Sequence, residues 1–196
     1  MTTDETTFYA AVGIPQGLIA DTAGADTAGA VRRGGELVSL TIDDYALWSS
    51  LATPMSWATI NEAAAVHGRS ATYGAVQQLK ELNLVLELNL GNSLGEQLRC
   101  LRPIPRGAGV GNVAAEPGTY QIKDEPDSPS PAVAVDPVAI MLWWEFDGSA
   151  SLERAVANVT NRLPELPRTA IERLVVLLLF RLMAQRLVYL DIAYET

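Results

Sequence analysis

The spacing of apolar residues over residues 68–101 changes from that of a helix to that of a strand. Ser70 belongs to the residue types that cap helix N-termini, and the apolar positions after it recur at helical spacing. Further along, leucines occupy alternate positions, as in a strand. The helical face would hold Val76, Leu79 and Leu82, and the strand face Leu84, Leu86 and Leu88. After a polar turn at 91–95, residues 98–101 are expected to pair back, so the pattern predicts a helix followed by a β-hairpin.

The residues before this stretch predict a strand and two further helices. Residues 36–40 have the composition of a short strand. Thr41 or Asp43 then caps a first helix, and Ser56 begins a second one. A strand, three helices and a hairpin in this order are typical of a winged helix. We therefore expect residues 31–103 to form a winged-helix module.

The second half of the chain shows the same order of signals. Residues 132–135 predict a strand, and Asp136-Pro137 marks a helix start with proline at the first helical position. Ser149 or Ser151 caps the next helix. Thr169-Ala-Ile-Glu172 is a capping box, which predicts the start of a long last helix. That helix is expected to run into a final strand.

A repeated Leu-Trp pair supports two copies of one module. The pair at residues 47–48 recurs at 142–143, an offset of 95 residues. We predict an α+β fold of two tandem winged-helix modules, each with three helices and a small antiparallel sheet. The predicted segments are a flexible N-terminal arm over 1–30, module 1 over 31–103, a Pro/Gly-rich linker over 104–130 and module 2 over 131–196. A strand over 118–123, inside the linker, stays open as an alternative.

A short motif follows the predicted strand of module 2. Pro137 starts a helix that ends in Leu142-Trp-Trp-Glu-Phe-Asp-Gly148, and a further helix follows from Ser151. The last helix then runs into residues 187–189. On this motif, residues 133–191 resemble the PqqD-like family, small winged-helix domains that bind leader peptides in the biosynthesis of ribosomal peptides.

The resemblance implies a location for a bound peptide. In that family the peptide adds a strand at the sheet edge and lies against the last helix. Here the groove would lie between residues 132–135 and the last helix. The residues expected at this peptide- or partner-binding surface are Val133, Val135, Trp144, Arg173, Val176, Leu177, Phe180 and Arg181.

Residues 174–180 of the last helix are apolar around the whole helix circumference. A helix of this kind must be buried on more than one side. Val176, Leu177 and Phe180 would point partly away from the module's own core. They are expected to pack against module 1 or the arm, or to form a surface for a partner or a second copy of the chain.

The charge of the chain disfavours nucleic acid as a partner. The net charge is −9, with −6 before residue 101 and −3 after it. Neither half is basic, and the expected wing, residues 91–97, contains Glu96 and no lysine or arginine. DNA binding stays an alternative because polar residues lie at the start of the expected recognition helix. These are Arg69, Ser70, Thr72, Tyr73 and Gln77.

Candidate catalytic and metal-binding residues are few. His67 and Cys100 are single residues of their types, so they supply no zinc set. Residues 107–111 are rich in glycine but lack the Gly-Lys-Ser/Thr ending of a phosphate loop. We expect no enzyme activity, no cofactor and no metal. The single cysteine and an N-terminus without a signal-peptide pattern favour the cytoplasm, and the longest apolar run is too short for a membrane span.

The sequence thus favours a non-catalytic adaptor that recognises a peptide or protein partner, such as the leader peptide of a ribosomal peptide precursor. A winged-helix DNA-binding regulator and a scaffold subunit that dimerises through its last helix are the two alternatives.

Overall fold

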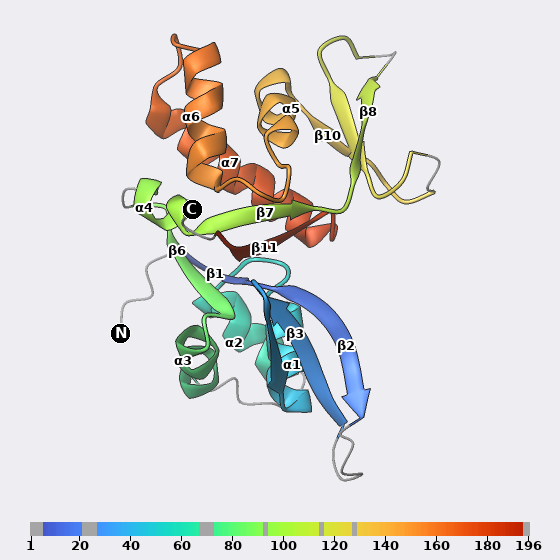
Figure 1. Cartoon of the computed structure of the whole chain (residues 1–196), viewed down its shortest axis with the longest axis vertical. Helices are drawn as coiled ribbons and strands as arrows, with labels where there is room; N and C mark the ends of the chain where they lie inside the picture. Colours follow the sequence, from blue (N-terminus) through green and yellow to red (C-terminus); the bar gives the residue numbers. More distant parts are fainter. Residues whose placement is uncertain are drawn as a thin grey trace. The chain divides into compact units, whose positions relative to one another are not determined.

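The chain folds into two units with one pattern of strands and helices (Figure 1). The computed structural model describes residues 6–20, 27–66, 73–91, 94–113, 116–126 and 129–193. Unit 1 is Met1–Asn92 and unit 2 is Ser93–Thr196. Helices and antiparallel sheets occur in both, so the protein belongs to the α+β class as predicted.

Unit 1 is built on two antiparallel sheets. Its elements are β1 (Thr7–Ala11), β2 (Ile14–Ala20), β3 (Thr27–Arg33), β4 (Glu36–Leu40), α1 (Ile42–Ser50), β5 (Met55–Ser56), α2 (Trp57–Val66), α3 (Tyr73–Glu81) and β6 (Val85–Asn89). One sheet has the order β2-β3-β4 and the other β5-β1-β6. The core contains Trp48, whose indole Nε1 donates to the carbonyls of Val12 (3.1 Å) and Leu84 (3.0 Å). This buried donor ties α1 to both chain segments that flank the β1–β6 pair.

Unit 2 adds a short helix before its first strand. Its elements are α4 (Gly95–Arg99), β7 (Leu101–Pro105), β8 (Ala108–Asn112), β9 (Tyr120–Lys123), β10 (Val133–Val135), α5 (Pro137–Trp144), α6 (Leu152–Arg162), α7 (Arg168–Ala184) and β11 (Val188–Ile192). The sheets are β10-β9-β8 and β11-β7. Helices α6 and α7 pack on the β7–β11 pair (Figure 1).

The two units share one order of elements within the described residues. In each, four strands are followed by three helices and a last strand that pairs with the first; unit 1 also has β5 between α1 and α2, and unit 2 has α4 before β7. The third helix ends alike in both units, because Asn83 and Arg186 adopt a positive φ of 52° and 57°. In both cases the next residue's N–H bonds back to the helix: Leu84 to the carbonyl of Leu79, and Leu187 to that of Leu182, each at 2.9 Å.

The helix starts within the described residues follow the predicted caps, with one exception; Ser70, the predicted cap of α3, lies outside these residues. The Thr41 hydroxyl accepts the N–H of Asp44, and the Ser151 hydroxyl accepts that of Arg154, so these two residues are the caps rather than Asp43 and Ser149. The capping box over 169–172 is wrong. Helix α7 already begins at Arg168, after Pro167, and the Glu172 carboxylate accepts from the Arg168 guanidinium instead.

The predicted wing of module 1 is wrong. Strand β6 pairs with β1, from Thr7 opposite Asn89 to Ala11 opposite Val85. Residues 95–99 form α4, whose Leu98 is buried, and β7 pairs with β11. The N-terminal strand buries Tyr9, Ala10 and Ala11 when it pairs with β6, and local spacing gives no sign of a partner so far away.

The predictions of a flexible arm and of a linker are also wrong, because both segments contain strands that pair within the described residues. Residues 7–20 contain β1 and β2, so within the described residues the segment expected as a flexible arm forms strands. The expected linker contains β8 and β9, and the alternative of a strand over 118–123 is confirmed by β9. Ile122 of β9 is fully buried, so this segment is part of the core of unit 2. The boundary between the units in the sequence falls after Asn92, eleven residues before the predicted module boundary at 103.

Candidate functional site

The outer face of α7 carries one exposed leucine between two arginines. Arg173, Leu177 and Arg181 follow one another at intervals of four residues and therefore lie on one face of the helix. Leu177 is 52% exposed, whereas Val176 beside it is fully buried. The prediction that Val176 faces a partner is therefore wrong, because one step along a helix turns its side chain into the core of unit 2. Leu177 keeps its predicted exposure.

An edge strand lies beside this face. Strand β10 is at the end of the β10-β9-β8 sheet, and the side chains of Val133 and Val135 are buried. Only the main chain of these two valines is left for contact with a partner. Ala134 between them is exposed, and its carbonyl accepts a hydrogen bond of 2.7 Å from Arg181 Nη2. Arg181 thus links the edge of β10 to the outer face of α7.

The two aromatic residues predicted for the surface differ in exposure. Trp144, at the end of α5, is 61% exposed and contacts Tyr120 of β9 edge-to-face, with ring centroids 6.4 Å apart. Phe180 is half-buried. Trp144 therefore offers a broad apolar surface on the same unit, while Phe180 contributes mainly to packing.

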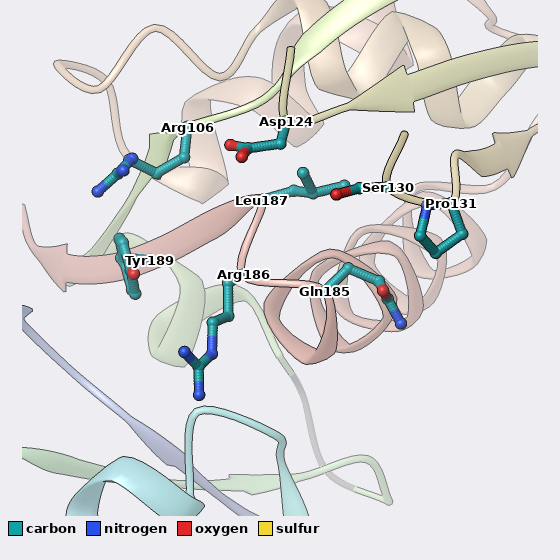
Figure 2. Close-up of a pocket in the computed structure, with 8 residues that line it drawn as sticks. All are labelled: Arg106, Asp124, Ser130, Pro131, Gln185, Arg186, Leu187 and Tyr189. Carbon is teal, nitrogen blue, oxygen red and sulfur yellow. The ribbon is translucent and has the colours of Figure 1, made fainter. Parts of the chain in front are cut away.

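A pocket of about 400 Å³ lies at the carboxyl end of α7 (Figure 2). It is lined by Arg106, Asp124, Ser130, Pro131, Gln185, Arg186, Leu187 and Tyr189. Gln185 is one further step of four residues from Arg181 along α7, and Pro131 precedes β10. The outer face of α7 and the edge of β10 therefore both lead to this pocket. We call Arg173, Leu177, Arg181, the β10 edge and the pocket together the α7 surface.

Arginines set the charge of the pocket. The Arg106 guanidinium lies over the ring of Tyr189, 5.7 Å from its centroid. Figure 2 shows Arg106, Tyr189 and Arg186 on one side of the pocket, with Gln185 and Pro131 on the other. Within the described part of the chain, no hydrogen bond or ion pair engages the side chains of Arg106, Arg186 or Asp124. The two arginines outweigh Asp124, so the pocket suits an anion.

The residues predicted for DNA binding are only partly described. Arg69, Ser70 and Thr72 lie outside the described residues. Tyr73 is exposed, but its ring packs edge-to-face on Trp57 at 5.5 Å. Gln77 is half-buried, and its Nε2 has no hydrogen-bond partner among the described atoms. The structure therefore places Tyr73 in an aromatic contact.

The aromatic contact continues into the core of unit 1. Trp57 also packs edge-to-face on Tyr9, with centroids 6.1 Å apart. Burial, and then the nearby Glu87 and Tyr73, raise the pKa of Tyr9, so its hydroxyl stays neutral. Lys80 pairs with Glu87 at the edge of this cluster. Since this lysine is paired with a carboxylate, it adds little net charge for a phosphate backbone.

Other chemistry is sparse in the described ranges. They hold no group of three or more His, Cys, Asp and Glu side chains arranged for a metal ion. None of their helices has the length and hydropathy that crossing a bilayer requires. Cys100 is exposed after α4, and His67 lies outside the described residues.

Comparison with protein-family models, curated proteins and solved structures finds no match to this chain.

Proposed function

We propose that the protein is a non-catalytic recognition protein that binds a peptide or protein partner at the α7 surface. The observation that carries this proposal is Leu177, a large apolar side chain that stays half exposed on a helix whose neighbouring positions are buried. Exposed apolar side chains within a polar rim are typical of interaction sites. Arg173 and Arg181 on either side favour an acidic partner.

The partner's main chain has a matching group on β10. A peptide that adds to this edge would donate an N–H to the Ala134 carbonyl, which Arg181 now occupies. Because Arg181 can release this carbonyl and turn to a carboxylate, it would exchange a neutral acceptor for a charged one. The arginine also protects the edge strand from unspecific pairing while no partner is bound.

We further propose that both units are variants of the winged helix. Each has three helices followed by a strand, and in unit 1 the strand order β5-β1-β6 places a short strand from between α1 and α2 in the same sheet. The second strand of the wing would be the N-terminal strand of the unit. The leader peptide of a ribosomal peptide precursor is a partner of the proposed kind, as the resemblance to the PqqD-like family implies.

Peptide selection followed by substitution of Leu177 tests the function. A random peptide library displayed on phage is selected against the full chain, and the selected peptides are measured by fluorescence polarisation. Leu177→Asp should weaken binding about tenfold or more, because it replaces an apolar contact with a charge. The matched control is Leu37→Asp, since Leu37 is an equally prominent exposed leucine in unit 1. Equal binding by both variants would contradict the proposal.

A further inference from the structure

We propose that the pocket at the end of α7 binds a carboxylate of an acidic peptide, held between Arg106 and Arg186. This inference rests on the proposed function, because the pocket is the end of the surface along which the peptide lies. It adds the chemical class of the partner and the two residues that recognise its charge.

The charge of the pocket differs from that of the protein. Four arginines lie along the α7 surface and in the pocket, and Asp124 is the acidic residue among the described residues that line the pocket. The four arginines are Arg106, Arg173, Arg181 and Arg186. The whole chain has a net charge of −9. A positive strip on an acidic protein draws acidic segments to that strip and repels them elsewhere.

The conformation of Arg186 indicates a role beyond ending the helix. It occupies the left-handed position after α7, with a φ of 57°, where glycine is the residue of lowest cost. Unit 1 has asparagine, Asn83, at the same position, and asparagine tolerates this conformation better than arginine. Unit 2 thus accepts backbone strain at a residue that lines the pocket, and strain of this kind is concentrated at functional sites.

Three backbone carbonyls at the end of α7 are already engaged by main-chain donors. The N–H groups of Arg186 and Leu187 bond to the carbonyls of Met183 and Leu182, at 2.8 and 2.9 Å. The carbonyl of Leu187 accepts in turn from the N–H groups of Arg106, at 2.8 Å, and Gly107, at 3.2 Å. These acceptors are therefore already satisfied, and they leave the arginine side chains to an incoming anion.

Asp124 and Gln185 favour a peptide over a simple anion. Both side chains line the pocket and offer acceptors for the N–H groups of a peptide. A carboxylate flanked by amide groups matches two arginines beside one aspartate.

The test uses a labelled octapeptide of alternating leucine and glutamate, with the full chain and three variants. Arg106→Gln and Arg186→Gly should each weaken its binding about tenfold, the loss typical of one charge-assisted contact. Arg154→Gln is the matched control, because Arg154 is an exposed arginine on α6, and it should bind like the native chain. Arg186→Gly should melt at the same or a higher temperature, so that weaker binding cannot be assigned to unfolding.

Two modified peptides identify which carboxylate is bound. One has an amidated carboxyl terminus, and the other has glutamine in place of glutamate. Weaker binding of either supports the inference and tells which carboxylate enters the pocket. If an octapeptide with both changes binds as well as the original, or if the pocket variants bind like the native chain, the inference is overturned.

The same assay separates this inference from the proposed function. Loss of binding in Leu177→Asp, together with native binding in both pocket variants, overturns the pocket inference and supports the proposed role of Leu177. Loss in the pocket variants, with native binding in Leu177→Asp, supports the pocket and contradicts the role of Leu177. Failure of the native chain to bind the acidic octapeptide overturns the inference, while the phage selection still decides the proposed function.

Discussion

Arg102 and Asp191 form the ion pair that joins β7 to β11. They lie opposite each other in the ladder, and Arg102 Nη2 donates to Asp191 Oδ2 at 2.8 Å. Asp191 is only 1% exposed, and Arg102 Nη1 also donates to the carbonyl of Gly148 at 3.3 Å. This single arginine therefore connects the central strand pair of unit 2 to the loop after α5.

Removing Arg102 should be costly because it leaves a buried carboxylate without its cation. We expect Arg102→Ala to lower the free energy of unfolding by about 3 kcal/mol. Arg162→Ala, which breaks the bridge of an exposed arginine to Glu145, should cost less than about 1 kcal/mol. Urea unfolding followed by circular dichroism measures both. A similar loss of unfolding free energy in the two variants would show that the burial of Asp191 does not determine the strength of its ion pair.

A second carboxylate holds the loop after α5. Asp147 Oδ1 accepts the N–H groups of Ser149 at 2.8 Å and Ala150 at 3.0 Å. These two bonds lower the pKa of Asp147 below its ordinary value, since they stabilise the ionised form. The Asp-Gly pair that the sequence singled out is thus a turn, in which Gly148 takes a positive φ of 78°.

At the scale of elements, α7 is the helix that both builds the core and presents the surface. Its apolar run over 174–180 is divided between two environments, with Val175, Val176, Leu178 and Leu179 buried and Leu177 exposed. The sequence alone left open whether a partner or the rest of the chain covers this run. The core of unit 2 covers most of this apolar run and leaves Leu177 exposed.

Val176 and Leu177 should therefore respond differently to truncation. Val176→Ala removes methyl groups from a packed core and should cost about 2 kcal/mol. Leu177→Ala should change stability by less than about 0.5 kcal/mol. Thermal unfolding of both variants, monitored by circular dichroism, checks the contrast. A loss of stability in Leu177→Ala as large as in Val176→Ala would mean that the leucine is covered in solution.

The edges of the sheets also differ in what they offer a partner. Strand β7 contains Pro103 and Pro105, which lack N–H groups and so cannot donate to an added strand. Strand β10 has no proline, but its central carbonyl is held by Arg181. A partner strand at β10 has to displace a side chain, whereas at β7 it would meet two positions that have no main-chain donor.

At the scale of the whole molecule, the position of β7 decides where the chain divides. The local pattern places residues 101–103 in module 1 and the next two in the linker, yet β7 pairs along its full length with β11, from Leu101 opposite Ile192 to Pro105 opposite Val188. Leu98 and Leu101 are buried. The segment after Asn92 therefore belongs to the second folding unit.

Two fragments distinguish the observed boundary from the predicted one. Residues 93–196 should unfold cooperatively when produced alone, because they contain β7 and its partner. Residues 104–196 should lack a cooperative transition, since β11 loses its ladder and the core loses Leu98 and Leu101. Circular dichroism melts and the dispersion of amide resonances measure the difference. A cooperative melt of the shorter fragment would restore the boundary at residue 103.

The candidate site could be predicted from the sequence only along one helix. Arg173, Leu177 and Arg181 share a face because their spacing fixes it, and Trp144 was correctly expected to be exposed. The pocket could not be predicted, because its lining comes from segments near residues 106, 124, 130 and 186. No local pattern connects these segments.

The sequence by itself determined the helices other than α4, the start of α2 at Ser56, and the caps of α1 and α6 to within two candidates each. It also showed the repeat of the Leu-Trp pair at an offset of 95 residues. These features depend on residues within a few positions of one another, so local spacing specifies them. Only the tertiary structure decided that β1 pairs with β6 and β7 with β11, and that Val176 is covered while Leu177 is not. Strand pairing and burial depend on which distant segments compete for the same partner, and that competition is settled by the packing of the whole unit.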